Sequence, residues 1–94
     1  MIRFHPAAKR EMIESARFDE EREEGLGLDF LDEVKAYVAR IEENPHLGEA
    51  VTGDLRRRYL RRFPFFLIYS TTPESVLLLA VAHTSRKPGY WEDR

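Results

Sequence analysis

The densest group of residues able to do chemistry is a run of five arginines within seven positions. Planar guanidinium groups bind phosphate and carboxylate oxygens in pairs, and the rings of Tyr59 and Phe63 accompany them. Such a run suits RNA or an acidic protein, or else it is charge that protects an edge strand from aggregation. On a strand without a turn near Leu60, Arg56, Arg58 and Arg62 would face one side, and Arg57 and Arg61 the other.

A second group of such residues lies near the end of the sequence, between positions 83 and 91. His83 offers an acid or base near neutral pH, Arg86 a phosphate ligand and Tyr90 a phenol. Each has a structural alternative, because a histidine at a strand end often serves the fold. Tyr90 and Trp91 equally suit covering an edge of the core. Spacing alone does not decide between these interpretations.

Other chemistries lack the residues they need. Three histidines share no ligand spacing and there is no cysteine, so we expect neither a metal site nor a disulfide. No glycine-rich phosphate loop or nucleophile elbow occurs, so we expect no cofactor. No apolar run reaches the length of a signal peptide or a membrane span, which predicts a cytoplasmic protein without a membrane partner.

Charge is unevenly distributed over the 94 residues, a length that predicts one domain spanning 1–94. Positions 1–50 carry seven Lys/Arg against thirteen Asp/Glu, a net charge of −6. Positions 51–94 carry eight against four, a net charge of +4. A partner responds to the local field rather than to the total, so this asymmetry favours a binding surface on the C-terminal half. The alternative is a solvated surface that only maintains solubility.

The N-terminal half predicts one strand and two helices. Positions 2–5 alternate as a strand does, and a helix follows over 7–24, whose acidic end, Asp19 to Glu24, should be largely solvated. Gly25 and Gly27 then interrupt the helix, and so short a link predicts an antiparallel helical hairpin. The apolar stripe of the second helix contains Leu28, Leu31, Val34, Val38 and Ile41.

The C-terminal half predicts three strands. After a loop over 45–53, strands are expected over 55–60 and 65–71. The almost unbroken apolar run over 76–82 suits a central strand that is buried on both faces. The predicted order is therefore β-α-α-β-β-β, an α+β fold in which the helical hairpin packs on a small antiparallel sheet.

Several segments together form a pattern that covers nearly the whole sequence. They are Gly53 to Arg57, Arg61 to Phe65 with Tyr69, Ala80 to His83, and Arg86 to Trp91. This pattern resembles the RelE/ParE superfamily of toxins, which belong to type II toxin–antitoxin pairs and are often described as plasmid-stabilisation proteins. The resemblance implies the α+β fold above and a cognate antitoxin that neutralises the toxin in a hetero-oligomer.

Members of this superfamily poison cells in two ways. RelE-like members cut mRNA on the ribosome, and they usually carry an arginine on the third strand within a motif like Tyr-Arg-x-x-Tyr. The matching stretch here is Phe65 to Tyr69, so Phe66 stands where that arginine would be. Losing it should remove much transition-state stabilisation. If the protein is nonetheless a ribonuclease, the resemblance implies a catalytic set of Arg58, Arg61, His83, Arg86 and Tyr90.

ParE-like members instead inhibit DNA gyrase and are not enzymes. The length of the sequence and the missing arginine resemble these members, so we predict a toxin that binds gyrase. The alternatives are a ribosome-dependent mRNA endoribonuclease and a non-toxic family member that only binds its antitoxin. We expect the antitoxin or the target to contact Arg56, Arg57, Arg58, Arg61, Arg62, Arg86, Tyr90 and Trp91.

Overall fold

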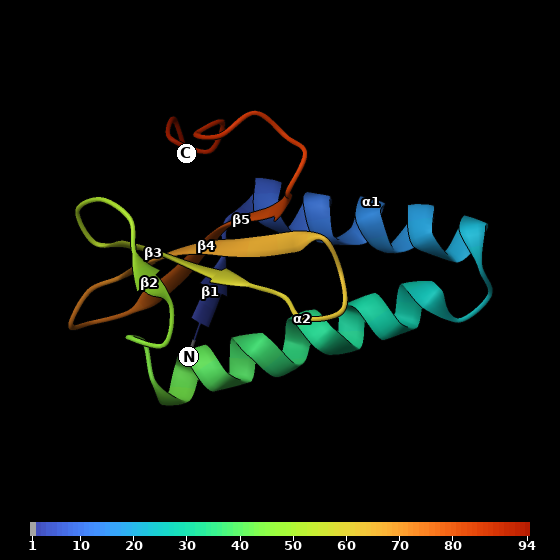
Figure 1. Cartoon of the computed structure of the whole chain (residues 1–94). Helices are drawn as coiled ribbons and strands as arrows, with labels where there is room; N and C mark the ends of the chain where they lie inside the picture. The colour runs from blue at the N-terminus through green and yellow to red at the C-terminus, as the bar shows by residue number, and fades with distance from the viewer. Residues whose placement is uncertain (1) are drawn as a thin grey trace.

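The computed structural model, described over residues 2–94, has two helices packed on a five-stranded sheet (Figure 1). The elements are β1 (Ile2–Phe4), α1 (Pro6–Arg22), α2 (Leu26–Glu43), β2 (Glu49–Ala50), β3 (Leu55–Tyr59), β4 (Phe65–Thr71) and β5 (Val76–His83). The strands lie in the order β1-β5-β4-β3-β2. The predicted α+β fold, with a helical hairpin on a sheet, is confirmed.

The sheet is mixed rather than wholly antiparallel, because β1 and β5 run parallel with Ile2 opposite Val76. The helical hairpin carries the chain to the far edge of the sheet. The chain then reverses between β3 and β4 and again between β4 and β5, so that β5 lies beside β1 and runs parallel to it. The loop predicted over 45–53 contains the short edge strand β2. As its apolar run predicted, β5 has a strand on each side, although β4 is the middle strand.

The helical hairpin depends on its N-terminal cap and on one close approach. His5 Nδ1 accepts a hydrogen bond from the amide of Ala7 at 3.0 Å, which caps α1, and Pro6 occupies the first turn. A Cβ atom at Gly27 would collide with the backbone oxygen of Ala16, so a glycine lets the helices approach there. No helix within residues 2–94 is long and apolar enough to cross a membrane.

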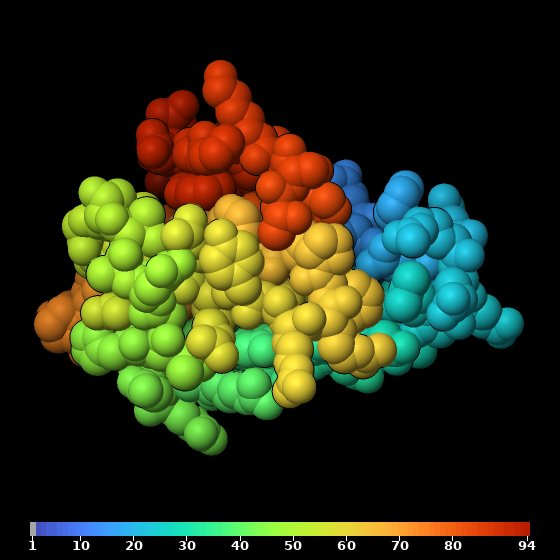
Figure 2. Space-filling model, viewed as in Figure 1, coloured from blue at the N-terminus to red at the C-terminus, as the bar shows by residue number. Residues whose placement is uncertain are grey.

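Two residues on the hairpin depart from the predicted burial. The acidic segment over 20–24 is exposed as predicted, but Asp19 is only 6% exposed, and its carboxylate lies 3.5 Å from Arg22 Nη1. Leu28, which we placed in the apolar stripe, is 66% exposed. The tip of the hairpin projects beyond the strands (Figures 1 and 2), so the first turn of α2 has no sheet beneath it. The buried stripe of α2 therefore begins in its second turn, at Phe30.

The sheet buries apolar side chains on both faces, but the two faces are covered differently. The helix-covered face contributes Phe65, Leu67, Tyr69, Leu78 and Val81 to a core that it shares with the helices, which contribute Phe30, Val34 and Ile41 of α2. The tail-covered face carries Phe66, Ile68, Leu79, Ala80 and Ala82, and Trp91 closes it. In Figure 1 the C-terminal tail, residues 84–94, lies on the opposite side of the strands from α2.

Candidate functional site

The arginine run is divided between β3 and the connection that follows it. β3 ends at Tyr59, and the next residue, Leu60, is buried in the helix-side core, so Arg61 and Arg62 lie in the loop before β4. The predicted alternation therefore holds only for the first three arginines. Arg58 lies over Tyr37 of α2, whereas Arg57 lies over Phe66 on the opposite face of the sheet.

Two arginines of the run are held by groups of the protein itself. Arg56 Nη1 donates to the carbonyl of Gly48 at 2.7 Å, and the amide of Gly48 donates to the Tyr69 hydroxyl at 2.8 Å. Any side chain at Gly48 would crowd that hydroxyl. Arg57 Nε and Nη2 lie 2.9 and 2.8 Å from Glu49 Oε1, across the β2–β3 pair. These two guanidinium groups fix the edge of the sheet.

The loop after β3 is anchored through its backbone, which leaves two arginine side chains exposed. The amides of Arg61 and Arg62 both donate to Glu33 Oε2 of α2 at 2.8 Å. Arg62 Nη2 also lies 3.6 Å from Asp29 Oδ2, an exposed pair that contributes little to stability. Arg61 therefore has a fixed backbone and a side chain available to a partner.

Two separate grooves contain four of the five residues predicted to be catalytic, and Tyr90 lines neither of them. One of about 490 Å³ lies between α1 and the ends of β4 and β5, and it contains His83 and Arg86 together with Arg62. The other, of about 540 Å³, borders β3 and contains Arg58 and Arg61. Because the grooves share no lining residue, the structure does not assemble the predicted ribonuclease set into one centre.

His83 makes local contacts at the end of β5. Its Nδ1 accepts a hydrogen bond from the Ser85 amide at 3.0 Å and lies 2.7 Å from Ser85 Oγ. The ring meets Phe65 edge to face, with 5.0 Å between the ring centroids. These contacts shape the turn into the C-terminal tail, which agrees with the structural alternative for this histidine.

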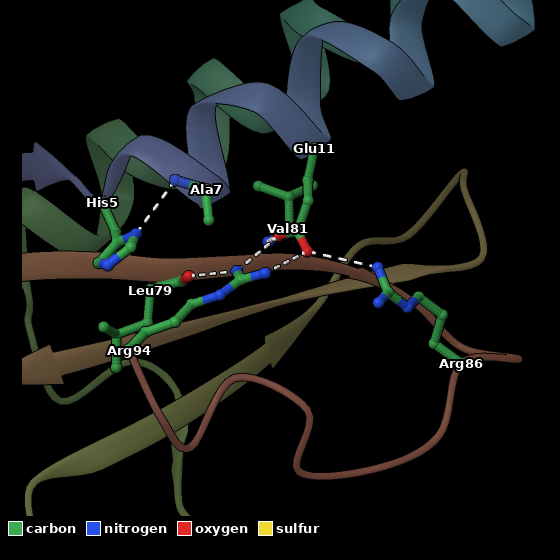
Figure 3. A network of polar contacts seen from close by, with 7 residues as sticks. All are labelled: His5, Ala7, Glu11, Leu79, Val81, Arg86 and Arg94. Atoms are coloured by element: carbon green, nitrogen blue, oxygen red, sulfur yellow. Dashed lines mark hydrogen bonds and ion pairs between the residues drawn. The ribbon is translucent and has the colours of Figure 1, made fainter.

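Glu11 of α1 ties the C-terminal tail to the open edge of β5 (Figure 3). β1 pairs with β5 only as far as Leu78, so the following backbone groups need other partners. The amide of Val81 donates to Glu11 Oε1 at 3.0 Å, and the carbonyl of Leu79 accepts from Arg94 Nη1 at 2.8 Å. Arg94 binds both oxygens of Glu11, at 3.0 and 2.9 Å. Two side chains thus replace a strand.

Sequence reasoning missed this pair. Glu11 and Arg94 lie 83 residues apart, and neither belongs to a motif. Burial alone would raise the pKa of Glu11, but the hydrogen bonds from Arg94 and from the Val81 amide outweigh burial and lower it. Glu11 is therefore ionised at neutral pH and fully paired with Arg94.

Tyr90 and Arg86 are packed against each other beside Glu11. The guanidinium carbon of Arg86 lies 3.7 Å from the centroid of the Tyr90 ring, and Arg86 Nη1 is 3.5 Å from Glu11 Oε2. Burial raises the pKa of Tyr90, and the charge of Glu11 raises it further. The phenol therefore stays protonated at neutral pH and is unsuited to act as a general base.

Phe66 lies in an aromatic cluster on the tail-covered face. It is only 9% exposed. Its ring meets Trp91 edge to face, with 5.7 Å between the ring centroids, and lies tilted against Tyr59, with 5.2 Å between the centroids. Trp91 is 6% exposed, which is the arrangement expected of an aromatic residue that covers an edge of the core. The position at which RelE-like ribonucleases usually carry an arginine is thus filled by packed rings.

Comparisons with known proteins show the family of this chain. A family model described as the ParE toxin of the type II toxin–antitoxin system parDE matches residues 2–88. The chain belongs to the ParE toxin family. It is therefore the toxin of a type II toxin–antitoxin module, a family that implies an antitoxin partner, and the predicted RelE/ParE membership is confirmed.

Solved structures resemble this ParE-family toxin in fold. A chain of the chromosomal ParDE system of P. aeruginosa is 11% identical, with a TM-score of 0.62 over 87% of this chain and 92% of that one. The isolated RelE toxin of E. coli is 19% identical, with a TM-score of 0.65 over 99% of this chain and 93% of that one. A search of curated protein sequences finds no match. At these identities the structures compare folds and not activities.

Proposed function

We propose that this ParE-family toxin inhibits DNA gyrase by binding and does not catalyse a reaction. The aromatic cluster around Phe66 is the observation that carries the proposal. A ribonuclease needs donors aimed at the charge that develops on the phosphate, and here Phe66 packs against Trp91 instead. The tail-covered face is therefore built for packing rather than for transition-state stabilisation.

The remaining acid–base candidates support a function without catalysis. Tyr90 keeps its proton and lies under Arg86, and the Nδ1 of His83 is occupied by Ser85. A general base works best when its pKa lies near the operating pH and its acceptor atom is free. Tyr90 fails the first condition because its pKa is raised, and His83 fails the second because Ser85 binds its Nδ1. The exposed arginines Arg61, Arg62 and Arg86 are instead proposed as contacts to the target protein.

The antitoxin is proposed to cover the outer surface of the helical hairpin with an amphipathic helix. Leu28 and Phe18 are 66% and 62% exposed, and an apolar groove of about 370 Å³ runs along Ile13, Ala16, Leu28 and Leu31. Exposed apolar surface of this kind marks a protein contact. The matched variants are Leu28→Ser within this surface and Val51→Ser, also an exposed aliphatic residue, outside it.

Only Leu28→Ser should weaken co-purification of the antitoxin encoded beside the toxin gene. Equal retention of the antitoxin by Leu28→Ser and Val51→Ser would place the antitoxin elsewhere.

The function is tested by inducing the toxin in cells and measuring DNA supercoiling and mRNA integrity in parallel. We expect growth arrest, relaxed plasmid DNA and intact mRNA. Cleaved mRNA with normal supercoiling would establish the ribonuclease alternative. Continued growth, with both readouts unchanged and the protein expressed, would show a family member that binds its antitoxin without being toxic.

A further inference from the structure

The groove beside β3 contains two arginines that no carboxylate within residues 2–94 binds. Arg58 and Arg61 both line this groove, and neither forms an ion pair with any described residue. We propose that the groove is a carboxylate-binding subsite for an acidic side chain of a partner peptide. Arg58 and Arg61 are its ligands, and Tyr37 is the platform beneath Arg58.

Arg58 is held in a position that suits a bound carboxylate. Its guanidinium carbon lies 5.5 Å from the centroid of the buried Tyr37 ring, which orients the group before any ligand arrives. Arg58 Nε is buried and has no hydrogen-bond partner. A buried donor without an acceptor is costly, so turning Nε toward a carboxylate in the groove, bound across Nε and a terminal nitrogen, would remove that cost.

The neighbouring arginines explain why the subsite is limited to these two. Arg56 is committed to the Gly48 carbonyl, and Arg57 is committed to Glu49. Arg61 differs because only its backbone amide is bound, to Glu33, so its guanidinium is free to close over a ligand. Of the arginines around the groove, Arg58 provides a fixed ligand and Arg61 a movable one.

Charge around the groove favours an acidic peptide over a nucleic acid. The groove is lined by three arginines and one acid, Glu49, which is paired with Arg57, and helix α2, which contributes Tyr37, carries five acidic residues against two basic ones. A phosphate backbone fixes a charge at every nucleotide along its course and would meet these acids, whereas a flexible glutamate side chain reaches the two arginines while the other carboxylates of the peptide stay in solvent. The partner segment would come from the antitoxin, so the inference rests on the antitoxin partnership of the proposed function.

The test uses the arginine Nε–Hε signals of the ¹⁵N-labelled full chain. Blocked tetraglutamate, its tetraglutamine counterpart and tetrauridylate RNA are titrated separately. We expect the signals of Arg58 and Arg61 to shift saturably with tetraglutamate alone, while those of Arg56 and Arg57 stay in place. Absence of a saturable shift at Arg58, or a larger shift with tetrauridylate, would overturn the proposal.

Matched variants separate the subsite from general charge attraction. Arg61→Gln should keep the fold, because the side chain is exposed and the amide bond to Glu33 is retained. It should weaken tetraglutamate binding about tenfold, whereas Arg10→Gln, an exposed arginine on α1, should leave it unchanged. Equal losses in both variants would overturn the subsite.

A supercoiling assay on the same preparations distinguishes the two proposals. Inhibited gyrase with an unmoved Arg58 signal refutes only the subsite. A shifted Arg58 signal with unaffected gyrase supports the subsite and refutes only the gyrase function.

Discussion

The two faces of the sheet are stabilised in different ways. The helix-covered face is closed by two long helices that bury a large core around Phe30, Leu67 and Tyr69. The tail-covered face is closed by an eleven-residue segment without a helix or strand, which relies on Trp91 and on the Glu11–Arg94 pair. Burial is distributed over many residues on the first face and concentrated in few on the second.

This difference shows which face should open more easily. On the helix-covered face, many residues pack in one cooperative core, so the loss of one contact leaves many others in place. The tail-covered face depends on a few contacts, so it should open at lower free energy than the whole chain unfolds. It is also the face that carries Phe66, at the position where the resemblance to RelE-like ribonucleases would imply an arginine. The closure of this face therefore bears on both stability and function.

The largest effect is expected at the centre of the helix-covered face. Phe30 is fully buried and contacts Phe63 and Phe65, so Phe30→Ala should lower the free energy of unfolding by about 3–5 kcal/mol. Phe18→Ala, which removes the same ring from an exposed site on the hairpin, should change it by less than about 0.5 kcal/mol. Urea unfolding followed by circular dichroism measures both. Similar losses in the two variants would contradict the account of this core.

A smaller and more local effect is expected on the tail-covered face. Trp91→Ala should lower the free energy of unfolding by about 2–3 kcal/mol, below the full cost of a core aromatic, because the tail can detach without unfolding the rest. Hydrogen exchange should then accelerate in the tail and at the Leu79–Val81 edge but not in α2. Asp93→Ala, at an exposed neighbour, is the control. Uniform acceleration throughout the chain would show that the two faces are not separable.

The smallest loss is expected from Glu11→Gln, about 1–3 kcal/mol, because the amide still reaches the Val81 backbone but no longer pairs with Arg94. Because folding lowers the pKa of Glu11, its ionised carboxylate stabilises the fold fully at pH values above the ordinary pKa of 4.5. This contribution is lost as the pH falls through the lowered pKa. Wild type should therefore lose more stability on acidification than Glu11→Gln. Parallel pH profiles would contradict this, and Glu14→Gln, one turn along α1, is the control.

Local patterns in the sequence predicted every element except the short edge strand β2, but they did not predict the contacts between distant segments. The apolar run of β5 correctly predicted a strand flanked on both sides, and two glycines correctly predicted the hairpin. The parallel pairing of β1 with β5 joins segments some seventy residues apart, and no local pattern encodes it. Leu28 fits the helical stripe but lies beyond the sheet, which periodicity does not reveal.

The candidate site was predicted only in part. The arginine run was identified, yet its division into structural and available members depends on Gly48, Glu49 and Leu60. Sequence left Trp91 and His83 with two interpretations each, and the structure packs both against aromatic rings. The Glu11–Arg94 pair had no signal at all, because two oppositely charged residues at opposite ends of a chain are ordinary in any sequence.

The central claim is that this toxin, whose tail-covered face is closed by the aromatic cluster around Phe66, acts by binding gyrase. The most direct measurement is DNA supercoiling by purified gyrase, titrated with the purified toxin to saturation. The account predicts dose-dependent loss of supercoiling, restored when the cognate antitoxin is added. Full supercoiling activity at saturating, folded toxin would contradict it.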